Sequence, residues 1–122
     1  MSEQKQRMIA GELYMADDPE LQEDALRAKA VMHELNTLHP AEKARRNALV
    51  AELLGEVGEG STVLPPFHCD YGQYISMGSG CFVNHGAVML DVARITIGDP
   101  TENEAFLTAA RTWPPRYGDI SV

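Results

Sequence analysis

The sequence has few cysteines and no long apolar run. Its two cysteines, Cys69 and Cys81, are too few for a disulfide framework, and we treat both as free thiols because nothing in the sequence argues for an oxidising compartment. The longest apolar stretch, residues 48–54, is broken by Glu52, and the N-terminus has no apolar segment of the signal-peptide kind. These absences argue against both a membrane span and a signal peptide. We therefore expect a cytoplasmic chain.

Positive charge is also scarce. Eighteen acidic residues against ten basic residues give a formal net charge of −8 over 122 residues. Such a field repels phosphates, which disfavours nucleic acid and anionic membranes as partners. The charge is unevenly placed, because residues 61–98 hold three charged side chains, Asp70, Asp91 and Arg94.

The first sixty residues predict three helices. A short helix over 3–13 is interrupted by Gly11, and a second helix begins at Asp18-Pro19, where an Asp caps the first turn and Pro fits the first helical position. A third helix ends before Gly58. The apolar residues expected on one face of the second and third helices are Leu21, Ala25, Ala28, Met32, Leu35, Val50, Leu53, Leu54 and Val57.

A six-residue period follows. Large apolar residues recur every six positions, and smaller or apolar residues recur four positions later, which predicts a parallel β-helix whose coils have three six-residue sides. A small antiparallel sandwich is the alternative, but it would show a period of two. The large positions are Tyr71, Met77, Val83, Met89 and Ile95, and the later ones are Ile75, Cys81, Ala87 and Ala93.

Glycines and one offset mark the expected corners. Gly72 and Gly78 follow large positions and suit corners that need positive φ. The run Ile97-Gly98-Asp99 has the form of a further corner, but it lies two residues out of step, as a small corner insertion would produce.

Several motifs carry a family resemblance. The chain resembles the maltose and galactoside O-acetyltransferases over about residues 5–99, with the helical motif, the proline junction and the coil motif in the family's order. The matching stretches are Met8-Ile9-Ala10-Gly11-Glu12-Leu13-Tyr14, His33-Glu34-Leu35-Asn36, Pro65-Pro66-Phe67-His68-Cys69-Asp70-Tyr71-Gly72 and Met89-Leu90-Asp91-Val92. The resemblance implies a homotrimer of left-handed β-helices that moves an acetyl group from acetyl-CoA to a sugar hydroxyl.

The resemblance and the patterns together give a fold class and a domain division. We expect an α+β chain with a helical maltose acetyltransferase-type domain over 1–60. The first coils of an incomplete left-handed parallel β-helix then occupy 61–99, and a divergent tail occupies 100–122.

The match ends at Asp99. The family continues with a His-Pro whose imidazole is the general base and with coils that bind CoA, whereas no His follows His85 here. Imidazole suits that step because its pKa lies near neutrality. We therefore expect a truncated family member that is inactive by itself. The alternative is a non-catalytic fragment that binds sugar or joins a mixed trimer.

Four residues match the family's acceptor-sugar positions. The resemblance implies sugar contacts for Asn84 and Asp91 through their amide and carboxylate groups, for Asp70 as a polar pocket residue, and for Phe82 as an aromatic stacking surface. The alternatives stay open. Asn84 and Asp91 also suit coil corners, Asp70 a solvated turn and Phe82 a packed position.

Other polar residues are weaker candidates. His85 adjoins Asn84, but the family's base comes from a later coil, so a structural role is expected. Asp17 and Asp18 could reach an acceptor, although helix capping explains both. We expect no metal site, because His68-Cys69-Asp70 is not supported by any spaced pair of ligands.

A β-helix coil cannot bury its interior alone. We expect the helical segment to cover one end of the coil, and counting from residue 65 gives fewer than two coils. The other end would be open unless Phe106, Leu107 and Trp113 fold back, with a short helix over 105–111. The sequence therefore predicts a marginally stable chain.

Overall fold

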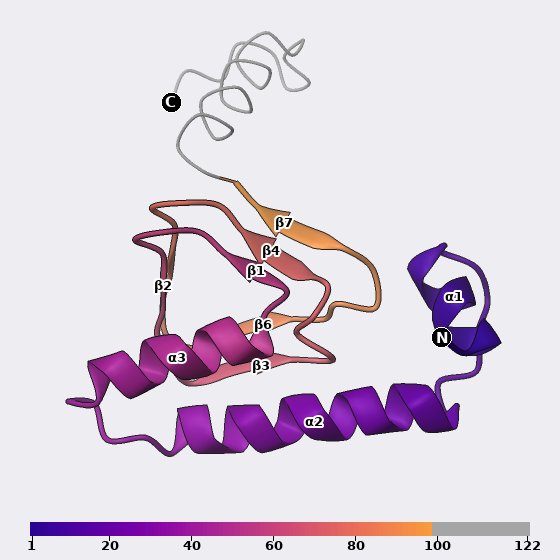
Figure 1. Cartoon of the computed structure of the whole chain (residues 1–122), viewed down its shortest axis with the longest axis horizontal. Coiled ribbons are helices and arrows are strands. Elements are labelled where there is room, and N and C mark those ends of the chain that lie inside the picture. The colour runs from indigo at the N-terminus through magenta and orange to yellow at the C-terminus, as the bar shows by residue number, and fades with distance from the viewer. Residues whose placement is uncertain (99–122) are drawn as a thin grey trace, which may run out of the picture.

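The computed structural model describes residues 1–98. In this range three helices precede seven short parallel strands (Figure 1). The helices are α1 (Glu3–Ile9), α2 (Pro19–Asn36) and α3 (Lys43–Leu53). The strands are β1 (Glu56–Val57), β2 (Thr62–Val63), β3 (Phe67–Cys69), β4 (Ile75–Met77), β5 (Phe82–Val83), β6 (Ala87–Met89) and β7 (Ile95–Ile97).

The three predicted helices are present. The Asp18 side chain caps α2 by accepting from the amides of Glu20 and Leu21, and Pro19 occupies the first helical position, as expected. The predicted extension of the third helix's apolar face to Val57 is wrong. It ends at Leu53, and Val57 lies in β1 because the chain there pairs with β4.

The strands wind into a three-sided coil. The sheets have the orders β1-β4-β7, β2-β5 and β3-β6, and all pairings are parallel. In Figure 1 these sheets form the upper, left and lower sides of a triangle. Partners lie 20 residues apart on every side, as in Thr62 with Phe82 and Phe67 with Ala87. The described residues therefore make two full turns and the first strand of a third.

One corner in each turn carries extra residues, so that a turn is longer than the predicted three sides of six residues each. The corner between β3 and β4 spans residues 70–74, and the equivalent one between β6 and β7 spans 90–94. The register pairs Met77 with Ile97, so the predicted two-residue offset of the Ile97-Gly98-Asp99 run is confirmed as far as Gly98. Counting coils from residue 65 missed β1 and β2, which precede it.

The longer corner displaces two of the predicted interior positions. Tyr71 lies in the corner 70–74 and packs in a cluster outside the coil, and Ala93 lies exposed in the equivalent corner. Both assignments to the coil interior are wrong, because the two extra residues fall at this corner. The interior positions that hold are Ile75, Met77, Cys81, Val83, Ala87, Met89 and Ile95, which belong to or pack against the core.

Gly72 behaves as the sequence predicts. Its φ is +80°, and a Cβ there would lie 2.4 Å from the Leu53 carbonyl oxygen. Gly78 has no positive φ, so that part of the expectation is wrong. The left-handed conformation instead falls at Gly80 in the same corner and at Gly86 in the corner after β5.

Helices α2 and α3 seal the first turn of the coil. Helix α3 packs against β1 and β2, and α2 packs against β3. The apolar residues predicted to cover this end are all buried in one core with the coil interior: Met32, Leu35, Val50, Leu53 and Leu54. Asn36 fastens α2 to β3, because its side-chain amide donates to the Phe67 carbonyl and accepts from the Phe67 amide, both at 2.9 Å.

A second, smaller cluster attaches α1 to the corner 70–74. Met8 of α1 packs with Leu21, Tyr71 and Tyr74. Around this cluster, the Lys5 ammonium lies 2.7 Å from the Asp24 carboxylate of α2, which raises the pKa of Lys5. Helix α1 thereby holds α2 and the coil together.

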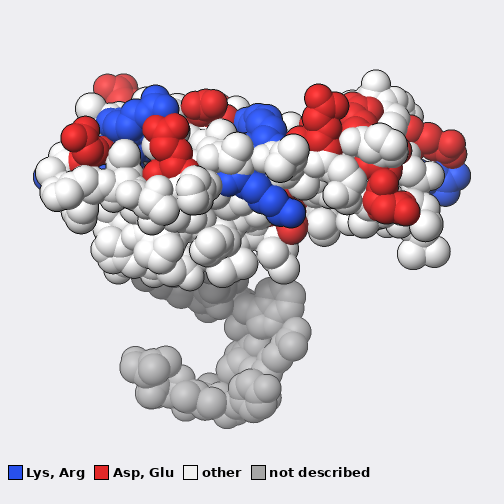
Figure 2. Space-filling view, turned by 90° about the horizontal axis from the view of Figure 1, so that it is seen from below, with Lys and Arg blue, Asp and Glu red and all other residues white. Residues whose placement is uncertain are grey.

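Charge separates the two parts of the molecule. Figure 2 shows the Lys, Arg, Asp and Glu side chains gathered over the helices, and a surface largely free of them over the coil. The described helices are not long and apolar enough to cross a membrane. The predictions for the short helix over 105–111 and for the tail over 100–122 lie outside the described residues.

Replacing a sealing residue should destabilise the chain far more than replacing an exposed one. Leu53 is 0% exposed in the shared core, so Leu53→Ala should lower the free energy of unfolding by about 2–5 kcal/mol. Leu13 is 93% exposed, so Leu13→Ala should change it by less than about 0.5 kcal/mol. Urea titration measures both. Equal midpoints for the two variants would contradict this account of the seal.

Candidate functional site

Asp91 holds the corner 70–74 in place. Its carboxylate is 0% exposed, and Oδ1 accepts hydrogen bonds from the amides of Asp70 at 3.0 Å and Tyr71 at 2.9 Å. Oδ2 accepts from the amide of Tyr74 at 3.3 Å. A sugar hydroxyl cannot reach this carboxylate unless the corner opens. The geometry in this chain therefore favours the corner interpretation of Asp91 over direct sugar contact.

Asp70 stands beside that buried carboxylate and is half-buried itself. Burial, and then the charge of Asp91, raises the pKa of the Asp70 carboxyl above its usual value. Unlike Asp91, the side chain of Asp70 is accessible, so it can accept a hydrogen bond from a ligand hydroxyl.

The neighbouring Cys69 thiol faces the interior side of the same corner. Its Sγ lies 3.7 Å from the Sδ of Met32 on α2. Burial, and then the carboxylates of Asp91 and Asp70, raises the pKa of the Cys69 thiol to about 12. The thiol is therefore protonated and is a poor nucleophile near neutral pH.

Phe82 and Asn84, the other two predicted sugar contacts, lie on β5 and directly after it. Phe82 is 62% exposed on β5, so its ring is free for a planar contact. Asn84 follows β5 and is exposed, and its Oδ1 accepts from the amide of His85 at 2.8 Å. This bond leaves the Asn84 side-chain NH₂ available to donate to a ligand.

The structure does not bring the four predicted residues into one site within the chain. Asp70 and Asp91 lie at the two stacked corners between the β3-β6 sheet and the β1-β4-β7 sheet. Phe82 lies in β5, and Asn84 lies at the corner between the β2-β5 and β3-β6 sheets. One full side of the triangle, formed by β3 and β6, separates the two pairs.

Two acidic residues before α2 have different surroundings. Asp18 is engaged in capping α2, and it also accepts from the Ser2 hydroxyl at 2.9 Å. Asp17 is exposed and makes no hydrogen bond among the described residues. Asp17 alone of this pair has a carboxylate free for a ligand.

Arg27 is a positioning residue that the sequence analysis did not identify. From α2 its guanidinium donates to the carbonyl oxygens of Glu52 at 2.6 Å and of Tyr71 at 3.4 Å. It therefore joins the end of α3 to the corner 70–74. The helical periodicity places Arg27 on a polar face, and no local pattern shows that this face meets the coil.

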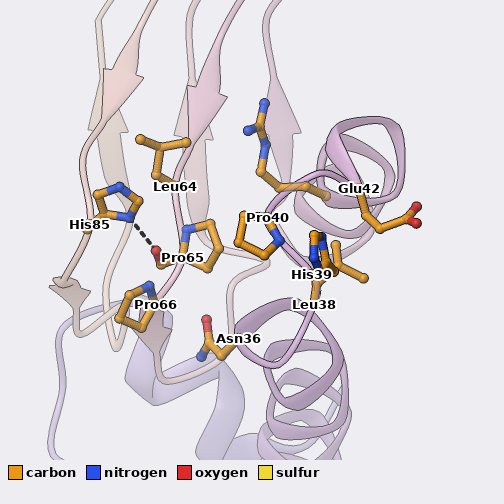
Figure 3. Close-up of a pocket in the computed structure, with 10 residues that line it drawn as sticks. Asn36, Leu38, His39, Pro40, Glu42, Leu64, Pro65, Pro66 and His85 are labelled. Atoms are coloured by element: carbon orange, nitrogen blue, oxygen red, sulfur yellow. Dashed lines mark hydrogen bonds between the residues drawn. The ribbon is translucent and has the colours of Figure 1, made fainter.

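A pocket opens beside His85, again unpredicted. It lies between the α2–α3 connection and the corner after β5, with a volume of about 220 Å³ (Figure 3). His85 forms one wall, where its Nδ1 is hydrogen-bonded to the Pro65 carbonyl oxygen. This contact gives His85 a fixed place in the corner. Within residues 1–98, no group of three or more His, Cys, Asp or Glu is placed to hold a metal ion.

Comparisons with known proteins identify relatives for this arrangement. Residues 7–58 match the family model of the maltose acetyltransferase hexapeptide capping motif. Nodulation protein L of Rhizobium meliloti is 47% identical over 98 residues, which are 80% of this chain and 54% of that protein. Galactoside O-acetyltransferase of Escherichia coli is 36% identical over 115 residues, which are 94% of this chain and 57% of that protein.

Solved structures agree with these matches. A galactoside acetyltransferase in complex with coenzyme A superposes with a TM-score of 0.76 at 34% identity, over 81% of this chain and 50% of that one. A hexapeptide-repeat acetyltransferase of Vibrio cholerae, complexed with acetyl coenzyme A, gives 0.72 at 39% identity, over 81% and 52%. The chain spans about half the length of the curated relatives it matches.

Removing the Asp91 carboxylate should loosen the corner 70–74. Asp91→Ala leaves three backbone amides without their acceptor, which should lower the free energy of unfolding by about 1–3 kcal/mol. Amide hydrogen exchange at Tyr71 and Tyr74 should become faster. Asp70→Ala is the matched control and should change neither quantity to that extent. Unchanged exchange in Asp91→Ala would mean that the carboxylate does not hold the corner.

Alkylation of Cys69 should depend on pH in an unusual way. Because the fold raises the pKa of this thiol from 9.0 to about 12, its reaction rate with iodoacetamide should still rise above about pH 10. The folded chain favours the protonated thiol, so this group's contribution to stability is present below about pH 8.5 and declines as pH rises. Mass spectrometry of the Cys69 peptide measures the rate. The urea-unfolded chain is the control, and a native rate that levels near pH 9 contradicts the prediction.

Proposed function

We propose, for a chain that belongs to the maltose and galactoside O-acetyltransferase family, that its described residues form the acceptor side of a sugar O-acetyltransferase. The reaction would move an acetyl group from acetyl-CoA to a hydroxyl of maltose, glucose or a galactoside. The observation that carries this proposal is the superposition of the capped coil on acetyltransferases solved with coenzyme A or acetyl coenzyme A. The β-helix is proposed to be left-handed, as in the family.

The acceptor would be held by residues from two corners. Asn84 would donate its side-chain NH₂ to a sugar oxygen, and Asp70 would accept from a hydroxyl. Phe82 would stack on the apolar face of the sugar ring. Asp91 would act through the corner, by holding Asp70 in place.

The separation of these residues supports an assembly of several chains. Asn84 and Phe82 lie one side of the triangle away from Asp70, so a small sugar cannot touch both corners of one chain. An acceptor that contacts both needs corners from two neighbouring chains. The homotrimer that the family resemblance implies would supply them, and we include it in the proposal.

Acetyl-CoA is the proposed co-substrate of the whole reaction. Its phosphates need cationic partners, and residues 61–98 contain one Lys or Arg side chain, Arg94. The described coil is therefore a poor binding surface for CoA, and residues other than these would bind it. The general base would also come from elsewhere, because no His follows His85 in the sequence.

These observations favour a second candidate function for the chain of 122 residues. A chain with acceptor residues and no base would bind sugar, or join a mixed trimer with an intact relative, without catalysing transfer by itself. Both candidates share the proposed acceptor residues and the cytoplasmic location predicted from the sequence. They differ in whether this chain turns over acetyl-CoA.

Sugar binding tests the acceptor side directly. Titration of the isotope-labelled chain, as the proposed trimer, with maltose or methyl galactoside should shift the amide signals of Asn84 and of Asp70 from the neighbouring chain, with a dissociation constant of about 1 mM or weaker because no CoA completes the site. Asn84→Ala should abolish the response at its corner. Asn47→Ala, an exposed Asn on α3, is the matched control. Amide signals that stay unshifted at sugar concentrations far above this dissociation constant would contradict the proposed acceptor residues.

A turnover assay on the same chain separates the two candidate functions, catalysis and binding without catalysis. The chain, incubated with acetyl-CoA and each sugar, should release no CoA thiol above background because it lacks the imidazole base. Turnover that His85→Ala abolishes would show that His85 is the base and that this chain is an enzyme by itself. Turnover that His85→Ala leaves unchanged would contradict the expectation that this chain lacks a general base.

A further inference from the structure

The pocket beside His85 is not assigned to acetyl transfer in the proposal above. Its walls come from two parts of the chain: the α2–α3 connection on one side and the corner after β2 and β5 on the other (Figure 3). Leu38, Pro40, Leu64 and Pro65 supply apolar surface. Its volume of about 220 Å³ lies below the roughly 300 Å³ at which pockets for drug-sized ligands begin, so it fits a small molecule.

Hydrogen bonds fix the proton positions on both imidazoles of the pocket. The Nδ1 of His39 accepts from the amide of Ala41 at 3.0 Å, so this nitrogen is unprotonated and Nε2 is a donor. The Nδ1 of His85 pairs with the Pro65 carbonyl oxygen, which can only accept, so this nitrogen carries the proton. In this tautomer the Nε2 of His85 is an acceptor. The helical wall offers a donor and the coil wall offers an acceptor.

Arg46 gives the helical wall a positive charge. Its Nε and Nη2 both donate to the neutral Asn47 Oδ1, at 3.2 and 3.1 Å, and it makes no salt bridge with a carboxylate within residues 1–98. Glu42 also lines the pocket, but Figure 3 shows its carboxylate pointing away from the other labelled residues. In a chain of net charge −8, this wall is a local site for an anion.

We propose that this pocket binds a small hydroxycarboxylic acid with an apolar body. The ligand carboxylate lies against Arg46, a charged donor, and against the His39 Nε2–H, a neutral donor on the same wall. The apolar body covers Pro40, Pro65 and Leu64. The ligand hydroxyl lies at the opposite wall and donates to the His85 Nε2. The site is a binding site without chemistry of its own, and binding there does not require acetyl transfer.

A titration with 4-hydroxybenzoate tests the proposal. The ring C–H signals of His39 and His85 in the full chain should shift and saturate together. Arg46→Gln should weaken binding about tenfold or more, because a hydrogen bond to a charged group is lost. Arg46 has only a neighbouring amide as its hydrogen-bond partner, so this variant should fold, and its amide spectrum checks that.

Matched controls separate the site from general attraction of anions. Arg45 lies on the same helix but pairs with Glu34 and does not line the pocket, so Arg45→Gln should leave the affinity unchanged. 4-Hydroxybenzamide, which lacks the negative charge, should bind at least about tenfold more weakly, and benzoate should lose the response of His85. Absence of saturable shifts, equal binding of the amide, or equal weakening by both Arg variants would overturn the proposal.

Discussion

A coil of short parallel strands cannot bury its interior by itself, and the seal formed by α2 and α3 is the constraint on which the described structure depends. Strands of two or three residues bury few side chains each, so the interior of the first turn is completed by Leu35, Val50 and Leu53 from the helices. Asn36 and Arg27 then tie the helices to the backbone of β3, the end of α3 and the corner 70–74. The helical segment is thus part of the coil's core, and its side chains are hydrogen-bonded to the corner 70–74 and to β3.

The sequence predicts the helices and the coil well because each rests on a local pattern. Asp18-Pro19 defines a helix start through capping, and the six-residue spacing of Met77, Val83 and Met89 marks one interior position on each of three sides. The length of a turn is less visible, since it depends on corners whose residues face outward. Tyr71 keeps the spacing by coincidence, and the register of β4 with β7 reveals that its structural equivalent is Asp91.

Residue types at the candidate site are also readable from the sequence, whereas the direction of each side chain is not. Asp91 and Asp70 are both acidic corner residues 21 positions apart, yet one is enclosed by three backbone amides and the other is accessible. Only the stacking of one turn on the next decides this. Arg27 and Arg46 likewise look like ordinary solvated helix residues until the helices meet the coil. For this reason the acceptor residues named from the sequence stay predictions, and the sequence gives no sign of the pocket.

Asn84 of the proposed acceptor site and His85 of the pocket are adjacent residues, joined by one peptide unit. The amide of His85 donates to the Asn84 side chain, while the ring of His85 is fixed to the Pro65 carbonyl oxygen of the turn below. A ligand that displaced the His85 backbone through this ring would also move the amide that orients Asn84, and a sugar that drew Asn84 away would release the same amide. Coupling of this kind is reciprocal, because each ligand changes the other's affinity by the same factor. A coil with such short strands makes this coupling direct, since three residues separate the end of β5 from the start of β6 and no flexible loop intervenes to absorb the change.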